Sequence, residues 1–468
     1  MRRSNWLFGW ALGALIPAAG TAQVHPPENV VLLSHLDRGD DYSGNWGYTS
    51  PTGVELAISG THLGTTFIDV SVPTAAAEVA FVPGPNSTWR EMATYGHYCY
   101  IVTEAEGAAL QVVSLADPLN PVLVTTLNPP ALPFTQAHEI KIDQETGICY
   151  VAGTHNPNGL TGLVILDLNP NPLAPSLRGT WPESGFTTAN YIHDLSVQDG
   201  KAYCAAIYAG TVYVLDVTQP GTPPILGNPW TWPNAFVHNT WPTLDGDYLV
   251  TTDENQGGHM RMWDIRNLDQ VSQTDEFISP TGALVHNAYF RGRYSFMSHY
   301  RDGLRVVDVL DPMNVVPVGW YDTHPEDGGG TRGAWGCYCF ATDPNIAYIS
   351  DRDSGTYILR FQPPNVGLAE PPASATAMPA LLGNLPNPFQ LSTAIRFHLD
   401  RAVPVSVRVY DASGRAVRTL DPRWFAAGNQ SVSWDGRDDA SSPVASGVYY
   451  YRLETPEFSA DGRVVLTR

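Results

Sequence analysis

Positive charge is scarce in this chain. Its 468 residues include only two lysines, Lys141 and Lys201, and Lys and Arg together number 26 against 46 Asp and Glu. The formal net charge is −20. Nucleic acids and anionic membrane surfaces are bound by basic surfaces, so this balance argues against both as partners. The acidity favours solubility outside a cell and is compatible with cation binding.

Cysteine is scarce as well. The chain has five cysteines, and they fall in short strand-like segments rather than in a spaced framework. We expect most of them to be small buried apolar side chains. A bridge between Cys149 and Cys204 is open as an alternative, but it is not predicted.

Long apolar runs are absent, apart from one short run at the N-terminus. The chain opens "MRRSNWLFGWALGALIPAAGTAQ", in which two arginines precede an apolar segment and a small-residue site. This pattern predicts a secretory signal peptide at residues 1–22, because a membrane-spanning helix needs about 20 apolar residues. We therefore expect Sec export to the periplasm and a mature chain without a transmembrane segment. Its final location would be extracellular or on a bacterial cell surface.

Common catalytic signatures are missing too. The sequence has no Gly-x-Ser-x-Gly elbow, no His-Glu-x-x-His and no Gly-rich phosphate loop. No catalytic residue is therefore identified. Whether the protein is an enzyme stays open at this point, with the balance against it.

Glycine and proline are abundant instead, with 42 and 39 residues, as in chains built from short strands and turns. Six strand-like runs share an apolar stretch that ends in Asp or a substitute, and a seventh carries Arg. These runs are "FIDVSVP" (Asp69), "VVSLADP" (Ser114), "VILDLNP" (Asp167), "VLDVTQP" (Asp216), "MWDIRNL" (Asp264), "VVDVLDP" (Asp308) and "YILRFQP" (Arg360).

A second repeated feature begins another strand upstream of most of these runs. Its copies are Trp46-Gly47, Trp89-Arg90, His138-Glu139, His193-Asp194, His238-Asn239, His286-Asn287 and Trp335-Gly336, at spacings of 43, 49, 55, 45, 48 and 49 residues. Units of about 40–50 residues with four short strands are typical of propeller blades. The sequence therefore predicts an all-β protein with a seven-bladed β-propeller over residues 23–362. Residues 28–37 are expected to supply the missing outer strand of the last blade.

Residues 29–362 resemble the LVIVD-repeat propeller of the "choice-of-anchor B" family. The resemblance is carried by "NWGYTSPTGVELAISGTHLGTTFIDVSVP", "GPNSTWREMATYGHYCYIVTEA", "AHEIKID", "IHDLSV", "VHNTWPT", "VHNAYFRGRYSFMSHYRDGLRVVDV" and "YDTHPEDGGGTRGAWGCYCF". It implies an exported propeller joined to a C-terminal anchoring or sorting module. It implies no particular activity.

The C-terminal part has a different pattern. Residues 363–384 are rich in Pro and Ala and predict a linker. Residues 385–468 alternate with period two and predict a small immunoglobulin-like β-sandwich. The segments "NPF", "VYDASGR", "WDGRDDAS" and "GVYYYRL" resemble the immunoglobulin-like domain of flagellar hook-capping proteins, a domain also seen as a sorting domain of type IX secretion cargo. The chain departs from the sorting version by ending in "RVVLTR", without a lysine-rich tip.

Four of the repeated strand heads are histidines. His138, His193, His238 and His286 begin the inner strands of four consecutive predicted blades, so their side chains should gather at one mouth of the channel. Imidazoles that converge from separate blades suit a divalent transition metal, whereas carboxylates in an acidic chain favour calcium. The alternative is a packing role, because ring nitrogens of inner strands also donate to carbonyls of the next blade.

Further polar residues are predicted at the same mouth. Some follow the histidines directly, and the others come from predicted loops that return to that face. The candidate binding residues are Glu139, Asp194, Asp253, Glu254, His299, Arg301, Asp322, His324, Asp351 and Arg352.

Two functions from different classes fit the sequence. The favoured one is an exported binding, adhesion or scaffold propeller that presents its mouth or rim to a protein, glycan or other surface ligand. Its C-terminal domain would engage secretion machinery for sorting or attachment. The alternative is a metal-dependent enzyme, oxidase-like or hydrolase-like, that uses the histidine and carboxylate cluster. Ligand geometry separates them, because an open coordination position favours the enzyme and rings turned into blade interfaces favour packing.

Overall fold

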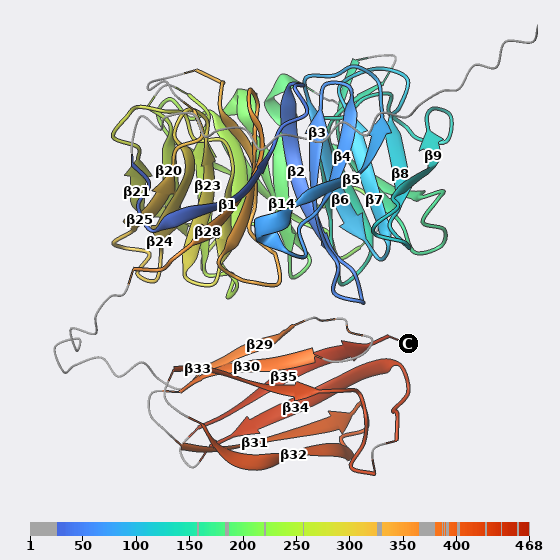
Figure 1. Cartoon of the computed structure of the whole chain (residues 1–468), viewed down its shortest axis with the longest axis vertical. Helices are drawn as coiled ribbons and strands as arrows, with labels where there is room; N and C mark the ends of the chain where they lie inside the picture. The colour runs from blue at the N-terminus through green and yellow to red at the C-terminus, as the bar shows by residue number, and fades with distance from the viewer. Residues whose placement is uncertain are drawn as a thin grey trace, which may run out of the picture. The chain divides into compact units, whose positions relative to one another are not determined.

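The computed structural model divides the chain into two compact units, Met1–Pro364 and Asn365–Arg468 (Figure 1). It describes residues 26–156, 159–182, 187–219, 221–255, 257–324, 330–364, 380–385, 387, 389, 393–399, 403–425, 428–440, 442–455 and 458–467. The predicted leader, 1–22, and most of the predicted linker lie outside these residues. Within them, no helix is long and apolar enough to cross a membrane.

Unit 1 consists of seven four-stranded antiparallel sheets. Six of them are each formed by four consecutive strands, from the inner to the outer strand. The first two sheets are β2(Tyr42–Thr49), β3(Glu55–Thr61), β4(Gly64–Asp69) and β5(Ala77–Pro83), and then β6(Arg90–Tyr95), β7(Tyr98–Thr103), β8(Leu110–Ser114) and β9(Val122–Leu127). The next two are β10(Glu139–Ile142), β11(Ile148–Asn156), β12(Gly159–Asp167) and β13(Ser176–Trp181), and then β14(Asp194–Gln198), β15(Lys201–Ala206), β16(Thr211–Asp216) and β17(Trp230–Thr231). The fifth and sixth are β18(Val237–Pro242), β19(Tyr248–Asp253), β20(His259–Asp264) and β21(Ser272–Ile278), and then β22(Ala288–Arg291), β23(Tyr294–His299), β24(Gly303–Asp308) and β25(Val316–Tyr321).

The seventh sheet joins the two ends of the unit. It contains β26(Ala334–Tyr338), β27(Ile346–Asp351), β28(Gly355–Phe361) and, from the N-terminal stretch, β1(Val30–Leu36). β1 pairs with β28 from Val30 opposite Phe361 to Leu36 opposite Thr356. The outer strand of the last sheet is thus supplied by residues that precede the first sheet.

The inner strands of the seven sheets neighbour one another in a closed cycle. β2 lies beside β6, β6 beside β10, and the series continues through β14, β18 and β22 to β26, which lies beside β2 again. Three short 3-10 segments, at Pro73–Ala75, Thr188–Asn190 and Ile207–Ala209, are the helical elements among the described residues. This all-β ring of four-stranded sheets is consistent with a β-propeller.

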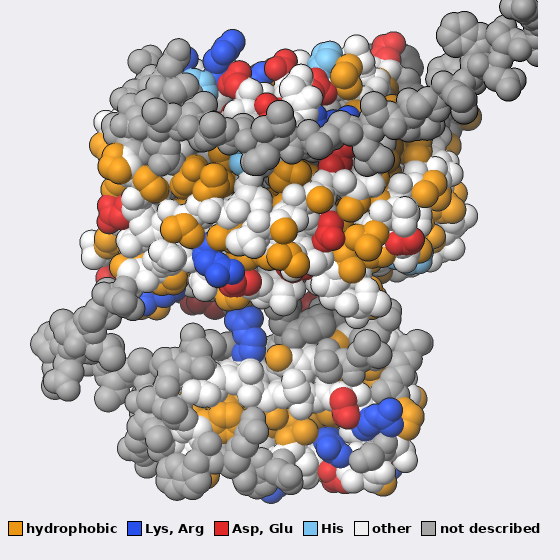
Figure 2. All heavy atoms as spheres, in the orientation of Figure 1, with side chains coloured by type: hydrophobic (Ala, Val, Ile, Leu, Met, Phe, Trp, Pro, Cys, Tyr) orange, Lys and Arg blue, Asp and Glu red, His pale blue; other side chains and the backbone are white. Residues whose placement is uncertain are grey.

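The core of unit 1 lies between neighbouring sheets. One hydrophobic cluster, for example, joins Tyr100 and Val112 of the second sheet to Ile140 and Val164 of the third. The second strands are therefore buried on both faces, which explains why their sequences are runs of apolar residues rather than alternating ones. The outer strands are more exposed, and β9 shows Val122, Leu123 and Val124 to solvent. Figure 2 shows such hydrophobic side chains spread over the visible side of this unit.

The repeated Asp at the end of the third strand has a local role. In Asp69, Asp167, Asp216, Asp264 and Asp308 the Oδ1 atom accepts the backbone N–H two residues later, at 2.9–3.1 Å. This Asx turn starts the connection to the outer strand. In the second sheet the Ser114 hydroxyl accepts the Ala116 N–H at 3.4 Å. Arg360 replaces Asp in the last sheet, where no such connection is needed because β1 is the outer strand.

Unit 2 is a sandwich of two sheets. One has the order β29(Ala380–Leu385), β30(Thr393–Leu399) and β33(Gly428–Trp434), and the other the order β32(Ala416–Phe425), β31(Val403–Asp411), β34(Gly447–Glu454) and β35(Ser459–Leu466). Its core holds Phe397, Trp434 and Tyr451, all at most 1% exposed. Strands that cover a single core alternate between buried and exposed residues, as the sequence of this region does.

The five cysteines are free and buried in unit 1. Burial raises the pKa of the thiol in each of them. They therefore act as small apolar core residues, as expected from the sequence, and Cys149 and Cys204 are not bridged.

Candidate metal centre

The register of the sheets defines one level around the axis of unit 1. The fifth residue of the second strand pairs with an inner-strand residue in six sheets: Asn45, Glu91, Glu139, Asp194, Asn239 and Gly336. In the sixth sheet the corresponding Ser298 exchanges backbone bonds with His286 and Asn287. The residue before each of these positions is Gly44, Arg90, His138, His193, His238, His286 and Trp335. We call this set of seven positions the mouth level.

The placement of two tryptophans in the sequence analysis is wrong. Trp335 is at the mouth level, as predicted, but Trp46 pairs with Ile58 and lies two positions further along β2. A register shift between Tyr42 and Asn45 displaces it. Trp89 comes one residue before the mouth level, which Arg90 occupies in the second sheet. The pairing of β6 with β7 has no such shift, so only the displacement of Trp46 is explained by an irregularity of the strand, which a pattern of residue types does not reveal.

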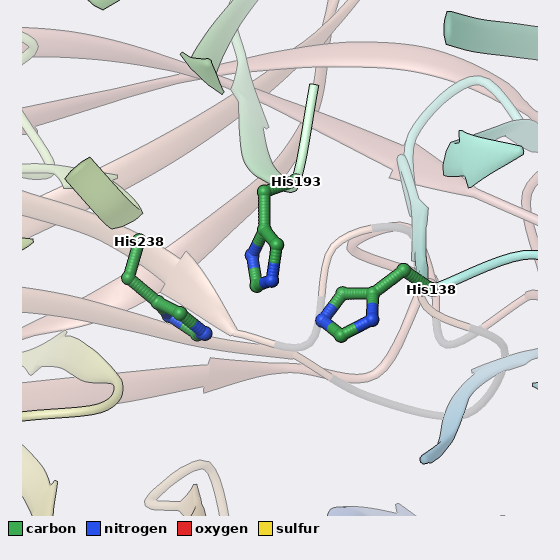
Figure 3. Close-up of side chains that lie close together, drawn as sticks. All are labelled: His138, His193 and His238. Atoms are coloured by element: carbon green, nitrogen blue, oxygen red, sulfur yellow. The ribbon is translucent and has the colours of Figure 1, made fainter. Parts of the chain in front are cut away.

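The four histidines are brought together. Ring centroids are 3.9 Å apart for His138 and His193, 4.4 Å for His193 and His238, and 4.0 Å for His238 and His286. The Trp335 ring continues the series at 4.3 Å from His286. All four imidazoles are at most 9% exposed. Figure 3 shows three of them, from separate strands, with their rings directed toward a common space.

Two overlapping sets of side chains have the ligand atoms for a metal ion. One is His138, His193 and His238, and the other is His238, Glu254 and His286; within each set the ligand atoms lie within 4.8 Å of one another. A tetrahedral ion at about 2.1 Å from each donor holds its donors about 3.4 Å apart. Rotation of the side chains by small amounts would therefore close either set around an ion. His238 belongs to both sets.

His286 is held in one tautomer by the next sheet. Its Nδ1 atom lies 2.7 Å from the carbonyl oxygen of Trp335, so Nδ1 carries the proton and donates it. The lone pair of Nε2 is then buried, and Nε2 has no hydrogen-bond partner. An unpaired buried acceptor costs about 1–3 kcal/mol. A metal ion would take up this lone pair, and the Nδ1 bond is the arrangement that orients metal-bound histidines.

His138 is held from the same side by a carboxylate. Its Nδ1 lies 2.6 Å from Oε1 of Glu104, which comes from the loop after β7. This carboxylate–imidazole pair also directs Nε2 away from the carboxylate, as in carboxylate–histidine–metal triads. Burial opposes the charged form of His138, but the hydrogen bond and charge of Glu104 raise its pKa above the ordinary value. Protonation of His138 therefore competes with the binding of a cation at its Nε2 atom.

The other three imidazoles are neutral. Burial lowers the pKa of His193, His238 and His286 well below the ordinary value, and neighbouring imidazoles lower it further. Neutral imidazole is the form that binds a metal. The mouth level thus offers deprotonated ligands at neutral pH.

Glu139 and Asp194, which were predicted as ligand-binding residues, are instead paired with Lys141. The Lys141 ammonium lies 3.0 Å from Oε2 of Glu139 and 3.5 Å from Oδ1 of Asp194. Asn239 donates from Nδ2 to the other carboxylate oxygen of Asp194 at 2.8 Å. Burial raises the pKa of Glu139 to about 7. These groups form a buried charged layer next to the histidines rather than part of the ligand set.

A third acid, Glu91, joins this layer. Trp335 donates from Nε1 to its Oε1 at 3.1 Å, and its carboxylate fills the space that a side chain at Gly44 would need. Burial, and then the charge of Glu139, raise its pKa well above the ordinary value. Next to the layer, the rings of Trp46, Trp241, Tyr289 and Tyr338 contact Phe340. Rings from four sheets therefore fill the axis there.

One of the remaining predicted residues, Glu254, reaches the histidines, and another, Arg352, reaches Trp335 beside them. Glu254 lies with its Oε2 3.9 Å from Nε2 of His238, and its other oxygen accepts the Tyr300 hydroxyl. Arg352 lies over the ring of Trp335, with its guanidinium carbon 5.2 Å from the ring centroid.

The other predicted residues are engaged elsewhere. The Asp253 carboxylate accepts hydrogen bonds from Trp232, Arg261 and the Phe236 N–H, and that of Asp351 accepts from the Thr323 hydroxyl and the Asp353 N–H. Asp322 accepts the His324 N–H, and the His324 ring lies near Asp353. His299 is buried beside Phe277, and Arg301 lies in the turn after β23. None of them belongs to either ligand set among the described residues.

Three residues that shape the site were not among the predicted binding residues: Glu104, Glu91 and Lys141. Glu91 could have been found from the sequence, because it follows the mouth level by one residue, as Glu139 and Asp194 do in their sheets. For Glu104 no signal existed beyond its place in a loop that returns to this face.

Comparison with known proteins identifies one part of the chain. Residues 389–457 match the family model of the FlgD Ig-like domain. This agrees with the two-sheet sandwich of unit 2. No curated protein sequence matches the chain.

Proposed function

We propose that the chain is an exported binding protein that holds a divalent transition metal at the axis of a propeller. Unit 1 is a seven-bladed β-propeller of the LVIVD-repeat "choice-of-anchor B" type, and unit 2 serves for sorting or attachment at the cell surface. The metal-bearing mouth presents a ligand site to a partner outside the cell. In this function the propeller is a binding or scaffold module rather than a catalyst.

The blade assignment is supported by the sheet order. Seven four-stranded sheets neighbour one another through their inner strands, and the N-terminal strand β1 completes the sheet of β26, β27 and β28. With β1 in place the last sheet has four strands like the others, and the two ends of unit 1 are joined by strand pairing. The resemblance of residues 29–362 to the LVIVD-repeat family adds the repeat type.

The metal assignment is carried by one observation: the buried Nε2 of His286 has no partner while Nδ1 of the same ring is bonded to a carbonyl. The donor set consists of imidazole nitrogens with one carboxylate, Glu254. Nitrogen donors favour zinc and its transition-metal neighbours over calcium, which prefers six to eight oxygens. When bound, such an ion would act as a Lewis acid with an open coordination position for an outside ligand.

The residues of the site divide into metal ligands and residues that orient them. His238, shared by both ligand sets, would be the central ligand, and His286 and His138 would be oriented by Trp335 and Glu104. Tyr300 holds Glu254, which keeps that carboxylate near His238 and His286.

Metal titration of the full chain tests this proposal. After chelator treatment and desalting, the protein is titrated with Zn²⁺ and separately with Ca²⁺, and bound metal is measured by elemental analysis. We expect about one Zn²⁺ per chain and a Zn²⁺ affinity far above that for Ca²⁺. His193→Ala and His238→Ala should each lose this binding, while the exposed control His97→Ala retains it. Retention of full binding by both site variants would sink the metal proposal.

A metal-dependent enzyme, oxidase-like or hydrolase-like, is a second candidate because Glu254 and Tyr300 lie beside His238 and His286. A carboxylate in contact with a phenol next to a bound metal is able to move a proton. The readout is turnover of ester, lactone or phenol substrates by the zinc- or copper-loaded chain. Turnover that is lost in Tyr300→Phe, with metal content unchanged, would favour this candidate over a binding module.

The proposed role of unit 2 rests on the match to the FlgD Ig-like domain. In an exporting host, we expect the full chain to reach the cell surface or medium and a chain ending at Pro364 to stay in the periplasm. Equal release of both chains would remove the sorting role. It would leave unit 2 as a spacer.

A further inference from the structure

Arg352 lies at the metal site without an acidic partner. It follows β27, and its Nη1 donates to the carbonyl oxygen of Thr331 at 2.7 Å. Its guanidinium stacks over Trp335, whose ring is 4.3 Å from His286. Within the described part of the chain, no carboxylate lies at ion-pair distance from it. A guanidinium has five N–H donors, so most of its hydrogen-bonding capacity is unused.

The nearby carboxylates are committed to other groups. Glu104 binds His138, and Glu254 accepts the Tyr300 hydroxyl. Asp353 lies 3.5 Å from Arg332 and 3.7 Å from His324. Asp351 binds Thr323 and the N–H groups of its own turn. Among the residues that the structure describes, the charge of Arg352 therefore has no carboxylate partner, next to a site that would carry a metal cation.

We propose that a carboxylate monoanion from a small ligand binds between the metal ion and Arg352. The inference rests on the proposed metal site and names the chemical class of its ligand. The planar fork of Arg352 matches the two oxygens of a carboxylate, one of which remains free to approach the metal. Trp89, half-buried and 6.2 Å from Trp335, provides an apolar surface for the body of the ligand.

The surroundings select a monoanion over a dianion. The chain carries a net charge of −20, and Glu104 and Glu254 lie beside His138 and His238. A phosphate dianion would meet more repulsion from these groups than a carboxylate with a single charge. An aromatic carboxylate combines the charge for Arg352 with a flat body for Trp89.

Benzoate is the probe. The full chain is first loaded with Zn²⁺ and its metal content is measured; benzoate, the neutral benzamide and inorganic phosphate are then titrated by calorimetry. We expect benzoate to bind at least about tenfold more tightly than benzamide or phosphate, because a charge-assisted hydrogen bond is lost in benzamide. Arg352→Gln should weaken benzoate by at least about tenfold with an unchanged zinc content. The control Arg332→Gln, an exposed arginine in the segment that leads into β26, should change it by less than about twofold.

The outcomes separate the two proposals. If wild-type chain binds no Zn²⁺, the metal proposal fails and this inference falls with it. If Zn²⁺ binds and benzoate does not, or binds Arg352→Gln as well as wild type, only the anion site is overturned. Tighter binding of phosphate than of benzoate would overturn the assignment to a carboxylate. Loss of benzoate in Arg352→Gln together with loss of zinc would overturn a direct contact between Arg352 and the anion.

Discussion

Two residue types repeat along unit 1, Asp at the end of the third strands and His at the mouth level, and their surroundings differ. The Asp216 carboxylate accepts both the N–H and the hydroxyl of Thr218 through one oxygen. The lone pair of Nε2 in His286, by contrast, is buried without a partner. The same repeat thus carries one residue whose bonds are satisfied locally and another whose bonds are not.

The difference teaches how to interpret repetition. The turn Asp recurs because the sheets share the same turn, and in each of them its carboxylate accepts hydrogen bonds from that turn. It is then not available to the other copies, which lie around the perimeter of the ring. A residue at the mouth level meets its copies, since the inner strands converge on one axis. Recurrence at the axis therefore produces a cluster, and recurrence at the perimeter produces equivalent turns.

Removal of the carboxylate behind His138 should have the largest effect. In Glu104→Gln, the hydrogen bond that orients His138 loses its charge, and we expect the affinity for Zn²⁺ to fall about 10- to 100-fold. Competition with a zinc chelator measures the change. Glu106→Gln, an exposed neighbour on the same loop, is the control. Equal affinities for the two variants would place His138 outside the ligand set.

Removal of a turn carboxylate should lower the stability of the fold and leave the zinc affinity unchanged. Asp216→Ala loses two local hydrogen bonds, and we expect a fall of about 1–2 °C in Tm, measured by thermal unfolding, with the Zn²⁺ affinity unchanged. Asp216→Asn keeps an oxygen that can accept the same N–H and should recover most of the loss. A change in zinc affinity would contradict the division between perimeter and axis.

Glu91 offers a smaller effect that depends on pH. Burial raises its pKa from 4.5 to well above that value, so the folded state disfavours the ionised form. Its contribution to stability is therefore most favourable below about pH 4.5 and declines as the pH rises toward the folded-state pKa. Relative to wild type, Glu91→Gln should gain about 1–2 °C in Tm between pH 5 and pH 8. A difference in Tm that does not vary with pH would contradict this.

The smallest effect is expected at the sheet that lacks the turn Asp. Ser114→Asp introduces a carboxylate where a serine hydroxyl accepts the Ala116 N–H at a long 3.4 Å. We expect a gain of a few tenths of a kcal/mol, at most about 0.5, because Asp forms this turn better than Ser. Thermal unfolding of the variant beside Ser114→Ala measures it. Equal stability of the two variants would show that the second sheet uses a different turn.

The sequence predicted the features that depend on local pattern. The turn Asp and the recurrence of His are in phase with the strands, so Asp216 could be assigned to the end of a strand and His238 to the mouth of the channel. The position of Trp46 could not be predicted, because a shift in register between Tyr42 and Asn45 alters which residue faces the mouth. Trp89 lies one residue before the mouth level although β6 pairs with β7 in continuous register, and the pattern of residue types carries no sign of this offset. The pairing of Glu104 with His138 depends on how two sheets pack, which no single segment encodes.

The pairing of β1 with β28 has a mechanical consequence. The backbone N–H of Gln362 donates to the Asn29 carbonyl at 2.7 Å, so the chain enters and leaves the ring at the same point. β28 is hydrogen-bonded to β1 on one side and to β27 on the other. A pull on the segment after Gln362 is met there by two ladders of hydrogen bonds, and part of the load passes to β25 through the bonds of Glu28 and Asn29. Whatever is attached beyond that point therefore pulls first on the two outer strands of the last sheet and not on its inner strand β26, which carries Trp335 beside the histidines.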